Sequence, residues 1–197
     1  GAGEGCAGGV CVGPTAVVEV GAGVEFSCAR IADGRVFCWG ANASGQLGDG
    51  TTTGSTSAVL VSGIIDAIDL AVGALHACVV RTGGTVSCWG ENSKQQVGDG
   101  TMMDRSTPIA DAGGITDARR ISAGGEHTCV VRATGAVSCW GRDNVGQLGD
   151  GSTGGDRGLG VDVVMLPSAA LQVECGGAHS CAVLDTGEVR CCGENGG

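Results

Sequence analysis

Tyrosine is absent from the 197-residue chain, and aromatic residues make up only 3% of it. Basic residues are also scarce, with 11 Lys and Arg against 21 Asp and Glu, and Lys94 is the only lysine. This shortage argues against a nucleic-acid partner, because counterion release from phosphates needs clustered basic side chains. The few aromatics argue against a sugar-binding platform. We therefore expect an acidic protein that binds neither nucleic acid nor carbohydrate.

Long apolar runs are missing as well. The best stretch, residues 58–72, is interrupted by Asp66 and Asp69, whereas a spanning helix needs about 20 apolar residues. The chain also lacks the Gly-x-x-x-x-Gly-Lys-Ser/Thr loop that cradles phosphates, and no unique nucleophile-and-base set stands out. We expect no membrane insertion, no catalysis and no cofactor.

Proline is rare, with 3 residues, whereas glycine is abundant, with 40. Because 42% of the chain is hydrophobic and the mean hydropathy is +0.21, regularly placed glycines favour a turn-rich fold over a disordered coil. The chain begins at Gly1 with no basic-plus-apolar leader, so we expect any signal peptide to have been removed or left out.

A cysteine-containing motif recurs four times. Its first cysteines are spaced 50, 51 and 52 residues apart, at Cys28, Cys78, Cys129 and Cys181. A period of this size is typical of propellers, solenoids and arrays.

Each motif predicts a disulfide-linked β-hairpin. Two cysteines lie ten positions apart, and a triplet ending in glycine, such as Ala32-Asp33-Gly34, lies midway. A three-residue loop that ends in a residue with positive φ places Ile31 opposite Arg35. Counting outward puts the cysteines at a non-hydrogen-bonded pair, about 4.5 Å apart at Cα. The expected pairs are Cys28–Cys38, Cys78–Cys88, Cys129–Cys139 and Cys181–Cys191.

The hairpin strands are apolar on both faces, as strands packed between two sheets are. An outer segment such as residues 58–61 and an inner strand such as 67–72 complete each repeat. Four strands per repeat is the count of a propeller blade. The sequence therefore predicts an all-β propeller of four-stranded blades, with about four repeats.

The full pattern reads Gly-x-x-His-x-Cys, a glycine turn, then Cys-Trp-Gly-x-Asn-x-x-Gly-Gln-Leu-Gly-Asp-Gly-Thr. From about Pro14 to the C-terminus it resembles the regulator of chromosome condensation repeat, and the cysteine pair is similar to that of secreted bacterial versions. The resemblance implies a seven-bladed propeller. Because the last repeat stops before its Gln-Leu-Gly, we expect a fragment or part of a larger propeller.

The domain organisation follows from the repeats. Residues 1–13 are expected to form an N-terminal cysteine loop and residues 14–197 the propeller repeats, in units of about 14–62, 63–113, 114–168 and an incomplete 169–197. An alternative is a small closed ring, in which the strand around Cys11 completes the fourth unit. A Cys11–Cys192 disulfide would accompany it.

The remaining cysteines are assigned by comparing repeats. Cys175 and Cys192 both depart from the residues at the matching positions of the other units, which suggests a coupled pair, and Cys6 would then pair with Cys11. A Cys₄ zinc site is the rival interpretation, but the close Cys-x₂-Cys knuckles of such sites are absent. No metal site is expected.

Other repeated residues have structural interpretations. His76, His127 and His179 precede hairpin cysteines, and repetition favours structural histidines over metal ligands; the first copy has Phe26 there. The Gly-Asp-Gly loops at Asp49, Asp99 and Asp150 favour turn chemistry over calcium binding. Trp39, Trp89 and Trp140 recur at one position, which indicates packing between blades.

Twelve cysteines at cross-linking spacing indicate an oxidising compartment, so the protein is expected to be extracellular, on the cell surface or periplasmic. The function predicted is a protein-binding scaffold, with contacts in residues 51–57, 101–107 and 152–161, where the repeats differ most. One alternative, implied by the resemblance, is guanine-nucleotide exchange on a small GTPase. Another is a structural repeat of a larger surface protein.

Overall fold

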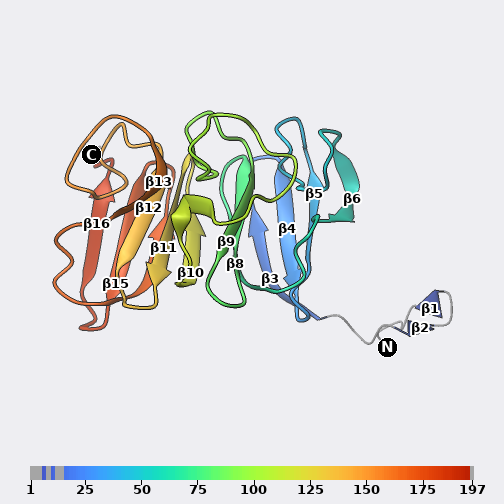
Figure 1. Ribbon diagram of the computed structural model, residues 1–197, viewed down its shortest axis with the longest axis horizontal. Coiled ribbons are helices and arrows are strands. Elements are labelled where there is room, and N and C mark those ends of the chain that lie inside the picture. The colour runs from blue at the N-terminus through green and yellow to red at the C-terminus, as the bar shows by residue number, and fades with distance from the viewer. Residues whose placement is uncertain (1–5, 8–9, 12–15, 196–197) are drawn as a thin grey trace.

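The structure, a computed structural model, describes residues 6–7, 10–11 and 16–195, with side chains from residue 16 onward. From residue 16 the chain forms four antiparallel sheets that stand side by side in chain order, from blue to red in Figure 1. We call these sheets blades 1 to 4. Within this described part, no helix is both long and apolar enough to cross a membrane.

Blades 1 and 3 each contain four strands. Blade 1 consists of β3 (Val17–Ala22), β4 (Phe26–Ile31), β5 (Val36–Gly40) and β6 (Ser55–Leu60). Blade 3 consists of β10 (Ala118–Ala123), β11 (His127–Arg132), β12 (Val137–Gly141) and β13 (Arg157–Asp162).

Blades 2 and 4 each contain three strands; only blade 2 departs from the prediction, because the fourth repeat was expected to be incomplete. Blade 2 consists of β7 (Ala67–Val72), β8 (His76–Arg81) and β9 (Val86–Gly90), and blade 4 of β14 (Ala170–Cys175), β15 (His179–Leu184) and β16 (Val189–Gly193). In blade 2 the outer strand is reduced to an isolated bridge between Gly90 and Arg105. Pro108 lies in this outer segment and has no N–H to give to a ladder. A short 3₁₀ helix, η1 (Ala112–Gly114), follows it.

The hairpins have the register that the turns predict. The Ile31 N–H donates to the Arg35 carbonyl at 3.0 Å, and Gly34 has a φ of 89°. Cys28 lies opposite Cys38 in the ladder, and the same register recurs in all four blades. The Sγ atoms are 2.10, 2.10, 2.13 and 2.06 Å apart, in Cys28–Cys38, Cys78–Cys88, Cys129–Cys139 and Cys181–Cys191 respectively. The turn chemistry thus fixes the cross-links.

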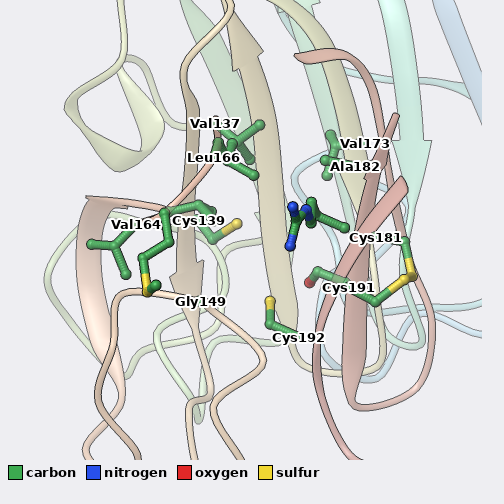
Figure 2. A pocket seen from close by; sticks show the side chains of 14 residues that line it. Val137, Cys139, Gly149, Val164, Leu166, Val173, Cys181, Ala182, Cys191 and Cys192 are labelled. Carbon is green, nitrogen blue, oxygen red and sulfur yellow. A yellow bond between two sulfur atoms is a disulfide. The ribbon is translucent and has the colours of Figure 1, made fainter. Parts of the chain in front are cut away.

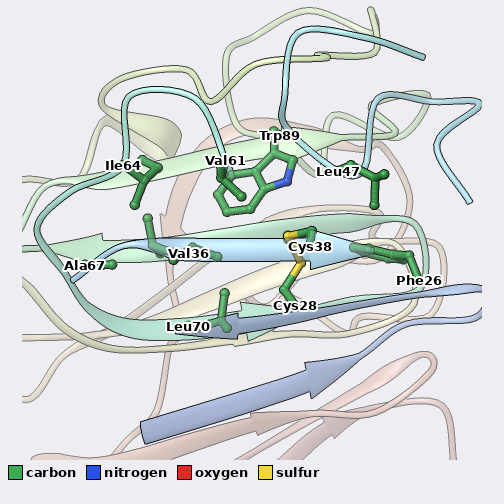
Figure 3. Close-up of a cluster of buried hydrophobic side chains, with 12 residues drawn as sticks. Phe26, Cys28, Val36, Cys38, Leu47, Val61, Ile64, Ala67, Leu70 and Trp89 are labelled. Atoms are coloured by element: carbon green, nitrogen blue, oxygen red, sulfur yellow. A yellow bond between two sulfur atoms is a disulfide. The ribbon is translucent and has the colours of Figure 1, made fainter. Parts of the chain in front are cut away.

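The core lies between neighbouring blades rather than inside any one of them. Figure 3 shows the cluster between blades 1 and 2, where Trp89 of blade 2 packs over Val36 and Cys38 of blade 1. Val61 and Ile64, from the connection between the blades, complete this cluster. A single hairpin cannot bury its apolar faces alone, so each blade depends on its neighbours.

The N-terminal segment forms a separate two-stranded pair. β1 (Cys6–Ala7) and β2 (Val10–Cys11) are antiparallel, with Cys6 opposite Cys11 in the backbone register. The small closed ring would require β2 to pair with β16. In the described chain, β2 pairs with β1 instead. The side chains of Cys6 and Cys11 lie outside the described residues, so a bond between them stays a prediction.

Candidate binding surface

Three loops lie along one edge of the row of blades, at the top of Figure 1. One buried side chain holds each loop. In blade 1, Asn42 accepts the Leu47 N–H at 2.9 Å and donates to the carbonyls of Thr51 and Thr53, both at 3.1 Å. Asn92 brackets the loop of blade 2 in the same way, and Asp143 takes this position in blade 3. These brackets give each loop a defined shape.

The three Gly-Asp-Gly aspartates close turns in these loops. Asp49 Oδ1 accepts the N–H of Thr51 at 2.9 Å and its hydroxyl at 2.8 Å. These hydrogen bonds hold the pKa of Asp49 below its ordinary value, although burial opposes them. Asp99 and Asp150 make equivalent turns.

Neighbouring loops are joined by backbone hydrogen bonds. The Gly50 N–H donates to the Ser106 carbonyl at 2.8 Å, and the Gly100 N–H donates to the Gly158 carbonyl at 3.1 Å. The three loops therefore form one continuous surface across blades 1 to 3. We call it the loop surface and define it as residues 51–57, 101–107 and 152–161.

Exposed apolar side chains stand on this surface beside ion pairs. Met102 is 58% exposed, Met103 67% and Leu159 59%. Arg105 pairs with Asp99 in the loop of blade 2, and the loop of blade 3 holds a similar pair between Arg157 and Asp150. Flexible methionines flanked by anchored charges suit contact with another protein.

Two of the three histidines link neighbouring blades. His76 is fully buried, and its Nε2 lies 2.9 Å from Thr128 Oγ1 of the next blade. Because the Thr128 hydroxyl donates to the Gln96 carbonyl at 3.0 Å, His76 must donate through Nε2. Burial lowers the pKa of His76 to about 3.

His127 repeats this arrangement with Ser180, at 2.8 Å, and burial lowers its pKa to about 4. The Nδ1 atoms of His76 and His127 are buried and have no hydrogen-bond partner within the described residues. His179, in the last blade, is exposed. The contacts of His76 and His127 thus join one blade to the next.

One cluster of ligand-type atoms occurs near the third blade. Single ligand atoms of His127, Cys129 and Cys175 lie within 4.8 Å of one another. Cys129 is already bonded to Cys139 and cannot supply a thiolate. Burial also raises the pKa of the Cys175 thiol to about 12, which keeps it protonated. This cluster is poorly suited to hold a metal ion.

The predicted Cys175–Cys192 disulfide is wrong, because both cysteines are free. The ladder explains why: Ser180 on the middle strand β15 pairs with Cys175 on one side and Cys192 on the other. Two strands at about 4.8 Å spacing separate the Cα atoms by roughly 9–10 Å, beyond the roughly 7 Å that a disulfide spans. Comparing repeats identified the two exceptional residues, but the bond predicted between them does not form.

The inner strands bring two carboxylates together. Asp69 of β7 accepts the Ile121 N–H at 2.9 Å and faces Glu19 of β3. Burial raises the pKa of Asp69 to about 6, and repulsion from Glu19 adds to this effect. A polar cavity of about 700 Å³ borders them, lined also by Arg120 and Glu174. Nothing in the repeat pattern singled out these carboxylates.

Fold and repeated contacts together define a β-propeller protein built from disulfide-linked blades. A family model described as Regulator of chromosome condensation (RCC1) repeat matches residues 17–46, 67–96, 118–147 and 171–196, and a second model with this description matches residues 33–80 and 134–183. These segments cover more than half of the chain. The protein therefore belongs to the RCC1 repeat family.

Two relatives show the same repeat. A Drosophila melanogaster protein named Regulator of chromosome condensation is 35% identical over 85 residues, which is 43% of this chain and 15% of that protein. The human probable E3 ubiquitin-protein ligase HERC6 is 29% identical over 177 residues, 86% of this chain and 17% of that protein. The chain thus spans less than a fifth of the length of either relative.

Solved structures show the same fold. Human WBSCR16 matches with a TM-score of 0.81 and 21% identity, covering 94% of this chain and 50% of that one. Yeast RCC1 (Prp20), in a complex with Kap60, matches with a TM-score of 0.78 and 20% identity, covering 93% and 45%. At these identities the likeness establishes the propeller fold alone.

Proposed function

We propose that the protein is a non-catalytic, extracellular scaffold that binds a protein partner through the loop surface. The observation that carries the proposal is the continuity of this surface. Its three loops are joined by backbone hydrogen bonds and stand on blades that are each cross-linked by a disulfide. A pre-shaped surface loses little conformational entropy when it binds.

The disulfides also support the proposed extracellular location. Cytosolic and nuclear thiols are kept reduced, whereas small disulfide-rich modules are typical of secreted and periplasmic proteins. In the source cells, we expect the protein in the surface or medium fraction with its hairpin cysteines oxidised. Recovery from the cytosol with reduced hairpin cysteines would contradict this part of the proposal.

Binding is tested with a matched pair of variants. The test variant combines Met102→Ser with Met103→Ser and removes two exposed apolar side chains of the loop surface. The control variant, Ile65→Ser, removes an apolar side chain that is 68% exposed and lies near the hairpin turns, at the opposite edge of the blades. Tagged proteins are cross-linked on intact source cells, and the captured protein is identified and its affinity measured.

We expect wild type and Ile65→Ser to bind the same protein, and the double methionine variant to bind it at least about tenfold more weakly, since central apolar contacts contribute most to affinity. Equal binding by all three proteins would place the contact elsewhere and refute the role of the loop surface. Failure of wild type to bind any protein would favour a purely structural repeat.

Guanine-nucleotide exchange on a small GTPase is the alternative that membership of the RCC1 repeat family suggests. The disulfides count against it, because nuclear and cytosolic thiols stay reduced. Accelerated release of a fluorescent guanine nucleotide from a small GTPase, by the oxidised protein, would support exchange over the scaffold.

A further inference from the structure

Two tryptophans fill equivalent slots between blades. Trp89 and Trp140 have no exposed surface, and each ring N–H donates at 2.9 Å to a main-chain carbonyl of the preceding blade, that of Gln46 and Gln96 respectively. The slot therefore consists of apolar walls and one carbonyl acceptor.

A glycine forms the floor of each slot. A Cβ at Gly48 would lie 2.8 Å from Trp89 Cδ1, and one at Gly98 would lie 2.6 Å from Trp140 Nε1. Each indole therefore needs a residue without a side chain beneath it. Gly149 is the matching residue between blades 3 and 4, and its φ of 66° equals that of Gly48.

Between blades 3 and 4 the same slot is built but holds no indole. Cys192 occupies the tryptophan position, pairing with Ser180 as Trp140 pairs with Thr128. Its Sγ is 3.5 Å from the Gln147 carbonyl, which corresponds to the Gln96 carbonyl. A thiol is much smaller than an indole, so most of the slot remains open.

A cavity of about 230 Å³ lies at this place. Figure 2 shows Val137 and Leu166 on one side, Val173 and Ala182 on the other, and Cys192 below them. The matching residues of the preceding interface pack around Trp140; they are Val86, Ile115, Ile121 and Val130. The apolar walls that surround Trp140 thus line an open cavity here, which Arg190 also borders.

We infer that the slot between blades 3 and 4 binds a small planar aromatic molecule of indole size that carries an N–H donor. An apolar cavity of about 150 Å³ holds benzene, so about 230 Å³ leaves room for a fused second ring. Two neighbouring slots of this chain already hold this chemical group, which is why the occupant is an indole-like ring rather than an aliphatic chain.

The main-chain carbonyl of Gln147, at this slot, can accept a hydrogen bond from such a donor. The Gln147 carbonyl accepts a hydrogen bond from the Ser180 hydroxyl at 2.8 Å, just as the Gln96 carbonyl accepts one from the Thr128 hydroxyl at 3.0 Å. Among the residues that the structure describes, the second lone pair of this carbonyl meets only the Cys192 thiol, a weak donor. Burial, together with the nearby Asp143 carboxylate, raises the pKa of Cys192. The thiol therefore stays neutral at pH 7, which suits an uncharged ring.

Indole itself is the probe. Titration calorimetry and ligand-observed NMR on the oxidised protein are expected to show saturable binding at one site per chain. Cys192→Trp supplies the missing ring and is expected to weaken indole binding at least about tenfold and to raise Tm by about 3 °C or more. Cys192→Ala leaves the slot open and is expected to retain binding. Cys192→Phe provides a second blocking variant if the tryptophan variant does not fold.

Benzofuran tests the hydrogen bond, because it has the shape of indole with a ring oxygen in place of the N–H. We expect it to bind at least about tenfold more weakly than indole. The inference is overturned if wild type does not bind indole, if folded blocking variants bind it as wild type does, or if benzofuran binds equally well.

Discussion

Replacement of Trp140 by Ala tests whether stability resides between the blades. Trp140 is completely buried against blade 2, whereas Trp39, at the same position of blade 1, is only partly buried. The two substitutions are chemically identical and differ in how much buried side-chain surface they remove.

The magnitude follows from this burial. Truncating a fully buried Trp to Ala costs about 3–5 kcal/mol through lost transfer energy and the cavity left behind. The Gln96 carbonyl keeps its hydrogen bond from Thr128, so loss of the indole N–H leaves no unsatisfied acceptor. For the partly buried Trp39, we expect about 1–2 kcal/mol.

Urea unfolding followed by circular dichroism, without reductant, gives both values. Trp140→Ala is expected to lower the midpoint clearly more than Trp39→Ala. If the two variants unfold alike, or if Trp39→Ala is the more damaging, burial between blades is not the main source of stability.

Three further predictions concern charge and cross-links. Because the pKa of His76 falls to about 3 in the fold from about 6.5 unfolded, stability should drop as pH falls below 6.5; His76→Phe, which imitates Phe26, should reduce that drop in acid unfolding curves by up to about 1.4 kcal/mol per pH unit. Asp69 has a raised pKa of about 6, so its ionisation costs stability as pH rises from about 4 to 6, and Asp69→Asn should stabilise the protein at pH 7.5 by on the order of 2 kcal/mol in urea unfolding. Replacing both Cys78 and Cys88 by Ala should cost about 2.5–3 kcal/mol in the same assay, since the bond closes a ten-residue separation.

Each of these predictions has a clear contrary result. An unchanged acid slope in His76→Phe would mean that the buried imidazole does not drive the pH dependence. Destabilisation of Asp69→Asn at pH 7.5 would show that the carboxylate charge is favourable in the fold. Unaltered stability without the Cys78–Cys88 bond would show that the hairpin is ordered just as well without it.

The hairpins could be predicted in detail because one glycine turn sets the whole local register. Given the turn at Ala32-Asp33-Gly34, the pairing of Cys28 with Cys38 follows by counting along antiparallel strands. The four-fold repetition then extends this result to each blade. The position of the tryptophans between blades could be read from the same repetition.

Contacts between blades could not be predicted with equal detail. Whether Cys175 can bond to Cys192 depends on the spacing across β15, and comparing repeats says nothing of that spacing. The His76 contact with Thr128 spans 52 positions and joins two repeats. The exposed Met102 and Met103 occur once, so repetition carries no signal about them.

The central claim is that each blade is cross-linked within its own hairpin. Digestion without reductant after alkylation of free thiols, followed by mass spectrometry, tests it directly. Among the ten cysteines from Cys28 onward, we expect four linked peptides that join cysteines ten positions apart, with alkylation at Cys175 and Cys192 alone. Peptides linking cysteines of different repeats, or alkylated hairpin cysteines in the native protein, would contradict it.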